Sequence, residues 1–133
     1  MNPRREPGGT GLTYVRIHLS KDAKAAPKTL RVHVDTGATD SMVSRRVLEA
    51  LGVLPESRVL VRLGDGRLME RDLGLAFVRY RKYATPTWVL FGERGDPSVL
   101  GALTLEELRL HVDPRTRRLR EVKVALLVPV AAS

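Results

Sequence analysis

The sequence contains no cysteine, so neither a disulfide framework nor a thiolate metal site can form. Its three histidines, His18, His33 and His111, stand far apart and lack the close spacing of zinc motifs such as H-E-x-x-H. No apolar run approaches the roughly 20 residues that a membrane-spanning helix requires. We therefore expect a protein with no metal, no cofactor and no membrane span.

Aromatic residues are also scarce, at 5% of the chain, which leaves few rings to stack on nucleic-acid bases. Acidic residues are outnumbered, with 15 Asp and Glu against 23 Lys and Arg and a net charge of +8. Such a balance can attract nucleic acid, but the basic residues are scattered and form no recognisable binding motif. A basic nucleic-acid-binding β domain is therefore a minor alternative, and nucleic acid is not the expected partner.

The length of 133 residues suits one domain. Residues 1–11 are polar and lack the apolar stretch of a signal peptide. We expect them to form a mobile N-terminal arm, and we expect a cytoplasmic protein. Residues 12–133 are expected to form the folded domain.

Alternating hydrophobicity predicts a mostly β fold. Residues 12–19 and 29–35 alternate and predict a hairpin whose second strand ends at Asp35. A second, longer hairpin is expected, with glycines at its tip. The two arms of that hairpin are expected over residues 58–63 and 67–81. Further strands are expected over residues 85–92, 99–100 and 119–128.

Two short helices interrupt the strands. Ser44 is expected to cap the first and Gly52 to end it. Thr104 is expected to cap the second, with Glu106 and Glu107 in its first turn.

The residues from Val34 to Ser41 read VDTGATDS and end the second strand with an acid, a hydroxyl and a glycine. Asp, Thr and Gly are all common in turns, so by themselves they are compatible with an ordinary turn. Their surroundings are more informative. An apolar strand precedes them, a hairpin tipped by glycines follows, and farther on an apolar pair and a glycine run directly into a helix.

This order of parts resembles the retroviral-type (retropepsin-like) aspartic proteases, the single-domain relatives of pepsin. The resemblance covers residues 12–128 and implies a mostly β, single-domain acid protease fold with two short helices. It implies that Asp35 is catalytic. It also implies an active-site loop formed by Thr36, Gly37 and Ala38. It implies a flap formed by Gly64, Asp65 and Gly66. A second motif would be formed by Val99, Leu100 and Gly101.

The C-terminal part of the chain is longer than in the compact viral enzymes. Residues 111–128 look like a hairpin added after the second helix, which is more similar to bacterial or archaeal members of the family. The apolar run at residues 124–128, VALLV, is expected either as a dimer-interface strand or as a central strand of the fold.

The motif occurs only once, and its chemistry needs two carboxyls. One group must take a proton from water while a second gives a proton to the peptide carbonyl oxygen. Two carboxyls held close together cannot both ionise, so one pair supplies both roles. Two identical chains on a two-fold axis can form that pair, because each Asp35 then meets its own copy. We therefore expect a homodimeric endopeptidase that acts on peptide or protein substrates.

Other residues around the motif have expected supporting roles. Thr36 is expected to brace the loop, and Gly37 to let the substrate approach while its amide holds Asp35. Three arginines close to the expected flap hint at acidic peptide substrates: Arg62, Arg67 and Arg71.

Several alternatives stay open. Asp40 or Asp65 could be the partner carboxylate, although Asp40 follows Asp35 too closely and Asp65 lies at a hairpin tip. A nucleophilic arrangement of Ser41 with His33 is formally possible, but no nucleophile elbow is present. A catalytically inactive peptide- or protein-binding module on the same fold is a further alternative, because a fold does not guarantee activity.

Overall fold

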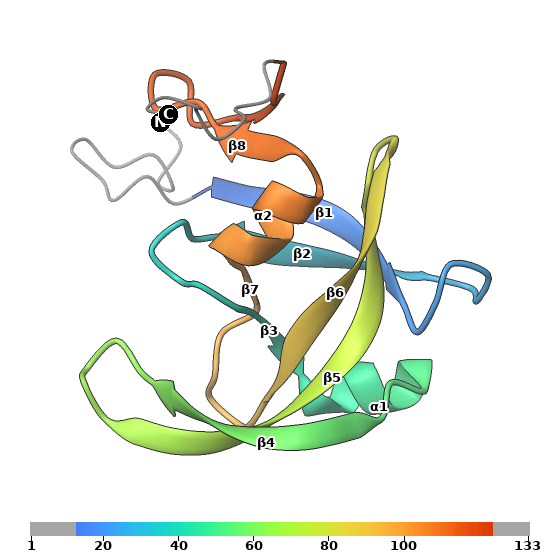
Figure 1. Ribbon diagram of the computed structural model, residues 1–133, viewed down its shortest axis with the longest axis vertical. Coiled ribbons are helices and arrows are strands. Elements are labelled where there is room, and N and C mark those ends of the chain that lie inside the picture. The colour runs from blue at the N-terminus through green and yellow to red at the C-terminus, as the bar shows by residue number, and fades with distance from the viewer. Residues whose placement is uncertain (1–12, 124–133) are drawn as a thin grey trace, which may run out of the picture.

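The computed structural model describes residues 13–123, whose arrangement is shown in Figure 1. Within this part of the chain there are nine strands and two short helices, which confirms the predicted mostly β fold. The strands are β1 (Thr13–Ser20), β2 (Lys28–Val34), β3 (Ser41–Ser44), β4 (Pro55–Arg62), β5 (Leu68–Tyr80), β6 (Tyr83–Gly92), β7 (Val99–Leu100), β8 (Leu110–Val112) and β9 (Leu119–Glu121). The helices are α1 (Arg45–Leu51) and α2 (Ala102–Glu107). The expected arm at residues 1–11 and the apolar run at 124–128 lie outside the described residues.

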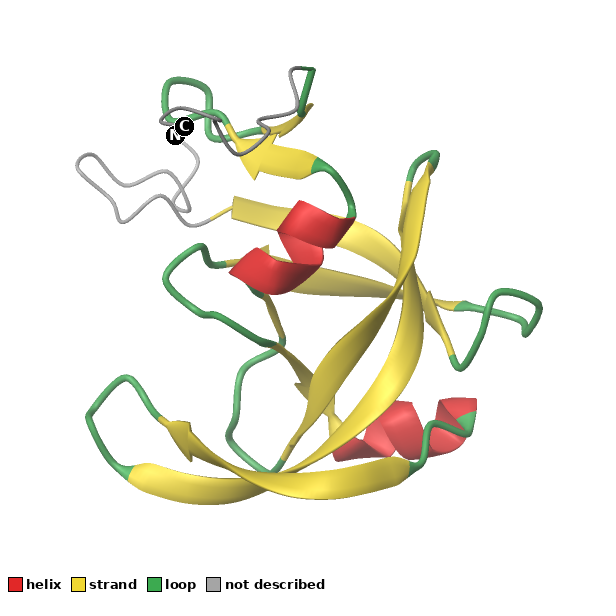
Figure 2. Cartoon of the chain, viewed as in Figure 1, coloured by secondary structure: helices red, strands yellow, loops and turns green. Residues whose placement is uncertain are grey.

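Seven of these strands form one sheet, in the order β1-β2-β7-β3-β6-β5-β4. β1 also pairs with β5, where His18, Leu19 and Ser20 lie opposite Arg79, Val78 and Phe77, so the sheet closes on itself. Figure 2 shows the β4–β5 hairpin reaching outward from the closed part of the sheet. The hairpin is therefore the part of the sheet best placed to cover a neighbouring surface.

The closed sheet encloses the core, and the predicted alternation decides which side chains enter it. In β1, Ile17 and Leu19 are buried, whereas Arg16 and His18, which alternate with them, are exposed. The largest fully buried apolar side chains come from the strands, from α1 and from the end of α2: Phe91, Ile17, Leu19, Leu48, Leu108, Val32, Val78 and Val89.

β7 is only two residues long, yet it organises the centre of the sheet. It pairs in parallel with β2, through His33 with Val99 and Val34 with Leu100. On its other side it pairs antiparallel with β3, through Met42 with Val99. The chain therefore leaves β2 on one side of β7 and returns in β3 on the other, so the β2–β3 loop wraps the end of β7.

The first helix is capped as predicted. The Ser44 hydroxyl accepts a hydrogen bond from the Val47 amide, and Gly52 ends the helix in the left-handed region with φ of 84°. Its amide donates to the Glu49 carbonyl. An αL residue at this position is the usual helix stop.

The predicted start of the second helix is wrong. α2 begins at Ala102, its N-cap is Gly101, and no side chain caps it. Thr104 lies buried inside the helix, and Glu106 and Glu107 are its last two residues rather than its first turn. The reason is that carbonyls of the β2–β3 loop satisfy the amides of the first turn, so no side-chain cap is needed there.

Strand β3 was not predicted, because four residues between a turn and a helix carry too little periodicity. The expected added hairpin is present at its start: β8 and β9 pair antiparallel in a separate two-stranded sheet. Among residues 13–123, no helix has the length and apolar character needed to span a membrane.

Candidate active site

Asp35 follows the last residue of β2 and is half-buried. Its amide donates to the Leu100 carbonyl of β7 at 3.1 Å, so the second motif holds the first in place. One oxygen of its carboxylate, Oδ1, accepts a hydrogen bond from the Gly37 amide at 2.9 Å. The Asp35 main chain is thereby tied to β7 and its carboxylate is held by one backbone amide, while Thr36 beside it is exposed.

The Gly37 main chain lies close to the Asp35 carboxylate. A Cβ atom at this position would lie 3.2 Å from Asp35 Oδ1, tighter than almost all Cβ contacts. Any larger residue would therefore press on the carboxylate that the amide holds. The expected role of the Gly37 amide agrees with this geometry.

Gly101 supports the same loop from behind. A Cβ atom here would lie 2.4 Å from the carbonyl oxygen of Asp40 and 2.9 Å from that of Ala38. The following amides donate to the loop, from Ala102 to the Ala38 carbonyl at 2.8 Å and from Leu103 to the Thr39 carbonyl at 3.0 Å. The start of α2 therefore lies directly against the Asp35 loop, and only glycine fits at the contact.

Three buried hydroxyls join the end of this loop to α2 and β6. Ser41 Oγ accepts from the Gly101 amide at 2.9 Å and lies 2.6 Å from Thr104 Oγ1, which in turn lies 2.7 Å from Thr87 Oγ1. Ser41 is 2% exposed, so its hydroxyl is inaccessible to a substrate. The alternative of Ser41 acting with His33 is therefore wrong.

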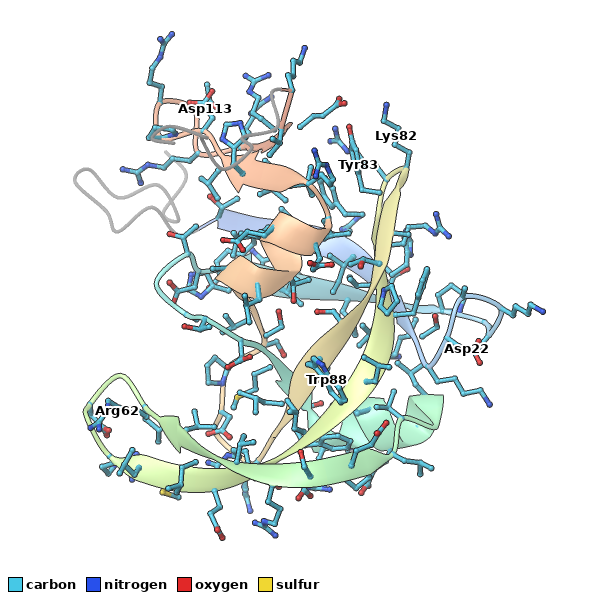
Figure 3. All side chains as sticks on the ribbon, viewed as in Figure 1. Asp22, Arg62, Lys82, Tyr83, Trp88 and Asp113 are labelled. Carbon is cyan, nitrogen blue, oxygen red and sulfur yellow. The ribbon has the colours of Figure 1, made fainter. Side chains whose placement is uncertain are left out.

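A groove of about 770 Å³ opens between the Asp35 loop and the β4–β5 hairpin. Asp35, Gly37 and Ala38 line one side, and the hairpin from Val59 to Arg67 lines the other. The loop after β6 forms a third wall through Gly95, Asp96 and Pro97. Figure 3 labels Arg62, one of the lining residues, near the end of the β4–β5 hairpin.

The hairpin tip is a tight turn closed by its own polar groups. The Leu63 amide donates to the Arg67 carbonyl at 2.8 Å, and Gly66 has φ of 92°. Hydrogen bonds from the Arg67 amide and guanidinium lower the pKa of Asp65. Asp65 is thus paired with Arg67 at an exposed tip, and this pairing argues against Asp65 as the second carboxylate beside Asp35.

The three arginines near the hairpin have different surroundings. Arg62 and Arg67 line the groove, but Arg71 does not and forms a buried pair with Asp96 of the third wall. Arg71 Nε lies 2.7 Å from Asp96 Oδ2, and a second nitrogen lies 3.2 Å from Oδ1. The expectation that Arg71 attracts acidic substrates is therefore wrong, because its charge is already paired. Instead, Arg71 fastens the loop of Asp96 to β5.

This buried pair predicts a pH-dependent loss of stability. The Arg71 hydrogen bond lowers the pKa of Asp96 below its usual 3.8, so the ionised carboxylate stabilises the fold above about pH 4. That contribution is lost as the pH falls through the folded-state pKa. Asp96→Asn should lower the free energy of unfolding by about 3 kcal/mol at neutral pH, because it leaves the buried guanidinium unpaired.

Urea unfolding of both proteins at about pH 7 and about pH 2 measures the effect. The difference between wild type and Asp96→Asn should shrink at the lower pH, where Asp96 itself is protonated. Asp65→Asn is the matched control, since its arginine partner is exposed and its loss should not change stability measurably. An equal difference at both pH values would contradict the assignment.

Within residues 13–123, no hydrogen bond joins Asp35 to a second carboxyl group, and no cluster of three or more His, Asp or Glu side chains could hold a metal ion. Asp40 is exposed and also lines the groove, but no hydrogen bond joins it to Asp35 among the described residues. One chain therefore contributes one Asp35 carboxylate, held by a backbone amide, to the lining of this groove, with no second carboxyl bonded to it among the described residues.

Comparison with known proteins gives a consistent result. A family model described as "Aspartyl protease" matches residues 21–102, more than half of the chain. Among solved structures, 13 chains match. One of them is the EIAV protease complexed with the inhibitor HBY-793, with a TM-score of 0.56 and 16% sequence identity over 81% of this chain and 92% of that chain. A search of curated proteins found no match.

Proposed function

The chain belongs to the aspartyl protease family, and from this premise we propose that it is an endopeptidase that works as a homodimer. In this proposal Asp35 of each copy contributes one carboxyl group to a single catalytic pair. The retropepsin-like fold and the peptidase class follow from the family match and the likeness to a retroviral protease. The dimer, the pair and the residue roles below are our inference.

The observation that carries the proposal is the position of one Asp35 carboxylate at the base of an open groove. Its Oδ1 is held by the Gly37 amide, and the loop around it is supported by Gly101. A carboxyl held in this way can take a proton from water, but peptide hydrolysis also needs a second carboxyl to donate a proton, and one chain does not supply it. A two-fold axis beside Asp35 supplies it from the second copy.

Each carboxyl of the pair has one role at a time. The ionised Asp35 takes a proton from a water molecule as the water oxygen bonds to the peptide carbonyl carbon. The protonated Asp35 of the other copy gives its proton to the carbonyl oxygen. The resulting tetrahedral diol then breaks its C–N bond. The first Asp35 gives the proton that it took from water to the amine nitrogen, and one hydroxyl of the diol returns its proton to the second Asp35, so the pair is again singly protonated. The two pKa values belong to the pair rather than to either residue.

The groove determines what can be presented to this pair. It is open along its length and bounded by the β4–β5 hairpin, which suits an extended peptide better than a compact ligand. In the proposal the hairpin tip at Gly64, Asp65 and Gly66 closes on the peptide and excludes water. Val99, Leu100, Gly101 and the active-site loop of Thr36, Gly37 and Ala38 hold Asp35 in place below it.

The flap assignment predicts that Gly66→Val slows turnover more than it destabilises the fold. Gly66 has φ of 92°, which a β-branched residue adopts only with strain, so the turn must change shape. We expect kcat/KM to fall about tenfold, since strain of about 1–2 kcal/mol is enough for that factor. Steady-state kinetics and thermal unfolding measure the two effects.

Gly64→Val is the matched control, because nothing lies within 4 Å of its added Cβ and its φ is not in the left-handed region. Gly66→Asn should recover most of the activity, since asparagine tolerates that region. Equal behaviour of Gly66→Val and Gly64→Val would show that the shape of this turn does not govern turnover.

The experiment that tests the proposed function is digestion of a mixed peptide library, followed by mass spectrometry of the products. A peptide analogue with a hydroxyl group in place of the scissile bond should block cleavage, because it mimics the tetrahedral species. Activity should follow a bell-shaped pH profile on the acid side. Peptide binding without any cleavage under these conditions would favour the inactive binding module instead.

A further inference from the structure

A second groove of about 470 Å³ lies between β6 and α2, outside the Asp35 groove. Three large apolar side chains line it while staying open to solvent: Leu75 is 41% exposed, Trp88 48% and Leu103 50%. Exposed apolar groups that converge on one hollow mark a surface used for binding more often than scattered ones do. We call this hollow the Trp88 groove.

The strand pattern explains why Trp88 is outside. In β6 the two threonines Thr85 and Thr87 are each 8% exposed, whereas the tryptophan that follows them is on the outer face. Leu75 lies opposite Trp88 in the paired strand β5 and shares that face. Figure 3 shows the Trp88 side chain on the face of β6 toward the viewer, below α2. The burial of Thr85 and Thr87 and the exposure of Trp88 reverse the ordinary preference for burying apolar side chains and exposing polar ones.

The charges at the rim of this groove have one sign. Among its described lining residues the charged ones are Asp40 and Glu107, both acidic and exposed, on a chain with a net charge of +8. A ligand that fits such a site has an apolar part for Trp88 and a cation for the rim.

The Trp88 groove adjoins the Asp35 groove at Asp40. Asp40 lines both of them, so it stands on the boundary between the two. Ser41 pairs with Val89 in parallel register, so Asp40 and Trp88 each precede the start of the same strand pairing, and both line the Trp88 groove. A peptide that leaves the Asp35 groove past Asp40 therefore arrives directly at Trp88.

We infer that the Trp88 groove binds the part of a peptide substrate that extends beyond the catalytic groove, and that it selects a large apolar residue next to lysine or arginine. This inference rests on the proposed function, because it takes the occupant to be the substrate of the Asp35 pair. It adds a preference for basic, apolar extensions. The two-fold axis of the proposed dimer provides one such groove at each end of the peptide.

Trp88 is the only tryptophan in the chain, so its fluorescence reports on this groove directly. The probes are uncleavable statine-centred peptides of alanine and valine, extended at both ends by Leu-Arg, by Leu-Glu or by Gly-Ser. We expect the Leu-Arg peptide to bind about tenfold more tightly than the Gly-Ser peptide, and to shift the Trp88 emission where the Gly-Ser peptide does not. Leu-Glu should bind no better than Gly-Ser.

Two variants and one control locate the effect. Leu103→Asn should remove the preference for Leu-Arg over Gly-Ser, and the double change Asp40→Asn with Glu107→Gln should remove the preference for Leu-Arg over Leu-Glu. Leu54→Asn is the control, since Leu54 is 73% exposed and lines neither groove. It should keep both preferences.

The outcomes separate this inference from the proposed function. Equal affinity for all three peptides with unchanged Trp88 emission would overturn the inference and leave the protease proposal intact. Retention of the preferences in Leu103→Asn and in the double variant would likewise overturn it. Failure of every statine peptide to bind would overturn the proposed function, and this inference with it.

Discussion

Asp35→Asn is expected to lower kcat/KM for peptide cleavage by at least about a thousandfold while leaving stability nearly unchanged. Asparagine has the shape of aspartate and can still accept the hydrogen bond from the Gly37 amide, so the loop should keep its conformation. However, an amide can neither take a proton from water nor give one to the carbonyl oxygen. Steady-state kinetics on a cleaved peptide and urea unfolding measure the two quantities.

Asp22→Asn is the matched control, because Asp22 is an exposed carboxylate in the β1–β2 turn, far from the groove in Figure 3. It makes the same chemical change and should keep full activity. Cleavage by Asp35→Asn at the wild-type rate would contradict the role of Asp35. A large loss of stability in that variant would show instead that the carboxylate serves the fold.

Gly101→Ala should have the second-largest effect, on both stability and activity. The added Cβ would lie 2.4 Å from the Asp40 carbonyl oxygen and 2.6 Å from its carbonyl carbon, both backbone atoms that cannot turn aside. The Asp35 loop and the start of α2 must therefore separate. Overpacking of this kind costs about 2–3 kcal/mol. A catalytic group displaced by about 1 Å loses roughly a hundredfold in rate.

Thermal unfolding and kinetics of Gly101→Ala measure the two effects. Gly64→Ala is the control for stability, because nothing lies within 4 Å of a Cβ atom there. If Gly101→Ala is as stable as wild type, the close packing of α2 against the loop does not exist in the molecule.

The sequence predicted the features that rest on local pattern. The β1–β2 hairpin that ends at Asp35 follows from alternation, and the capped helix α1 follows from Ser44 and Gly52. The glycine-tipped β4–β5 hairpin follows from its turn residues. In each case the residues that decide the structure are close together in the chain, so their order alone is informative.

Contacts between distant segments could not be predicted in this way. The Ser41–Thr104 hydrogen bond joins residues 63 apart, and nothing near Thr104 distinguishes a buried hydroxyl from a helix cap. The buried pair of Arg71 with Asp96 joins residues 25 apart, and nothing near Arg71 in the sequence distinguishes a paired arginine from one that lines the groove. For Gly101 the motif was visible in the sequence, but its contact with the Asp40 carbonyl was not.

The Trp88 groove had a partial signal in the sequence. The alternation of Thr85 and Thr87 with Pro86 and Trp88 shows that threonine and tryptophan must face opposite sides of one strand. Which side is buried depends on what covers it. α2 contributes to this choice by providing Thr104 as the partner of the Thr87 hydroxyl, and Thr104 is in turn hydrogen-bonded to Ser41 of β3.

The central claim is that two copies of Asp35 form one catalytic pair, and a tandem protein with two copies joined by a flexible linker tests it most directly. Asp35→Asn is introduced into the first copy alone, the second copy alone, or neither. Cleavage is measured at concentrations low enough that separate tandem proteins do not associate, which sedimentation checks. A shared pair predicts full activity for the unchanged tandem and a loss of at least about a thousandfold for either single change, since one asparagine disables the pair. Half of the activity in each singly changed tandem would show that every copy works alone, and would contradict the shared pair.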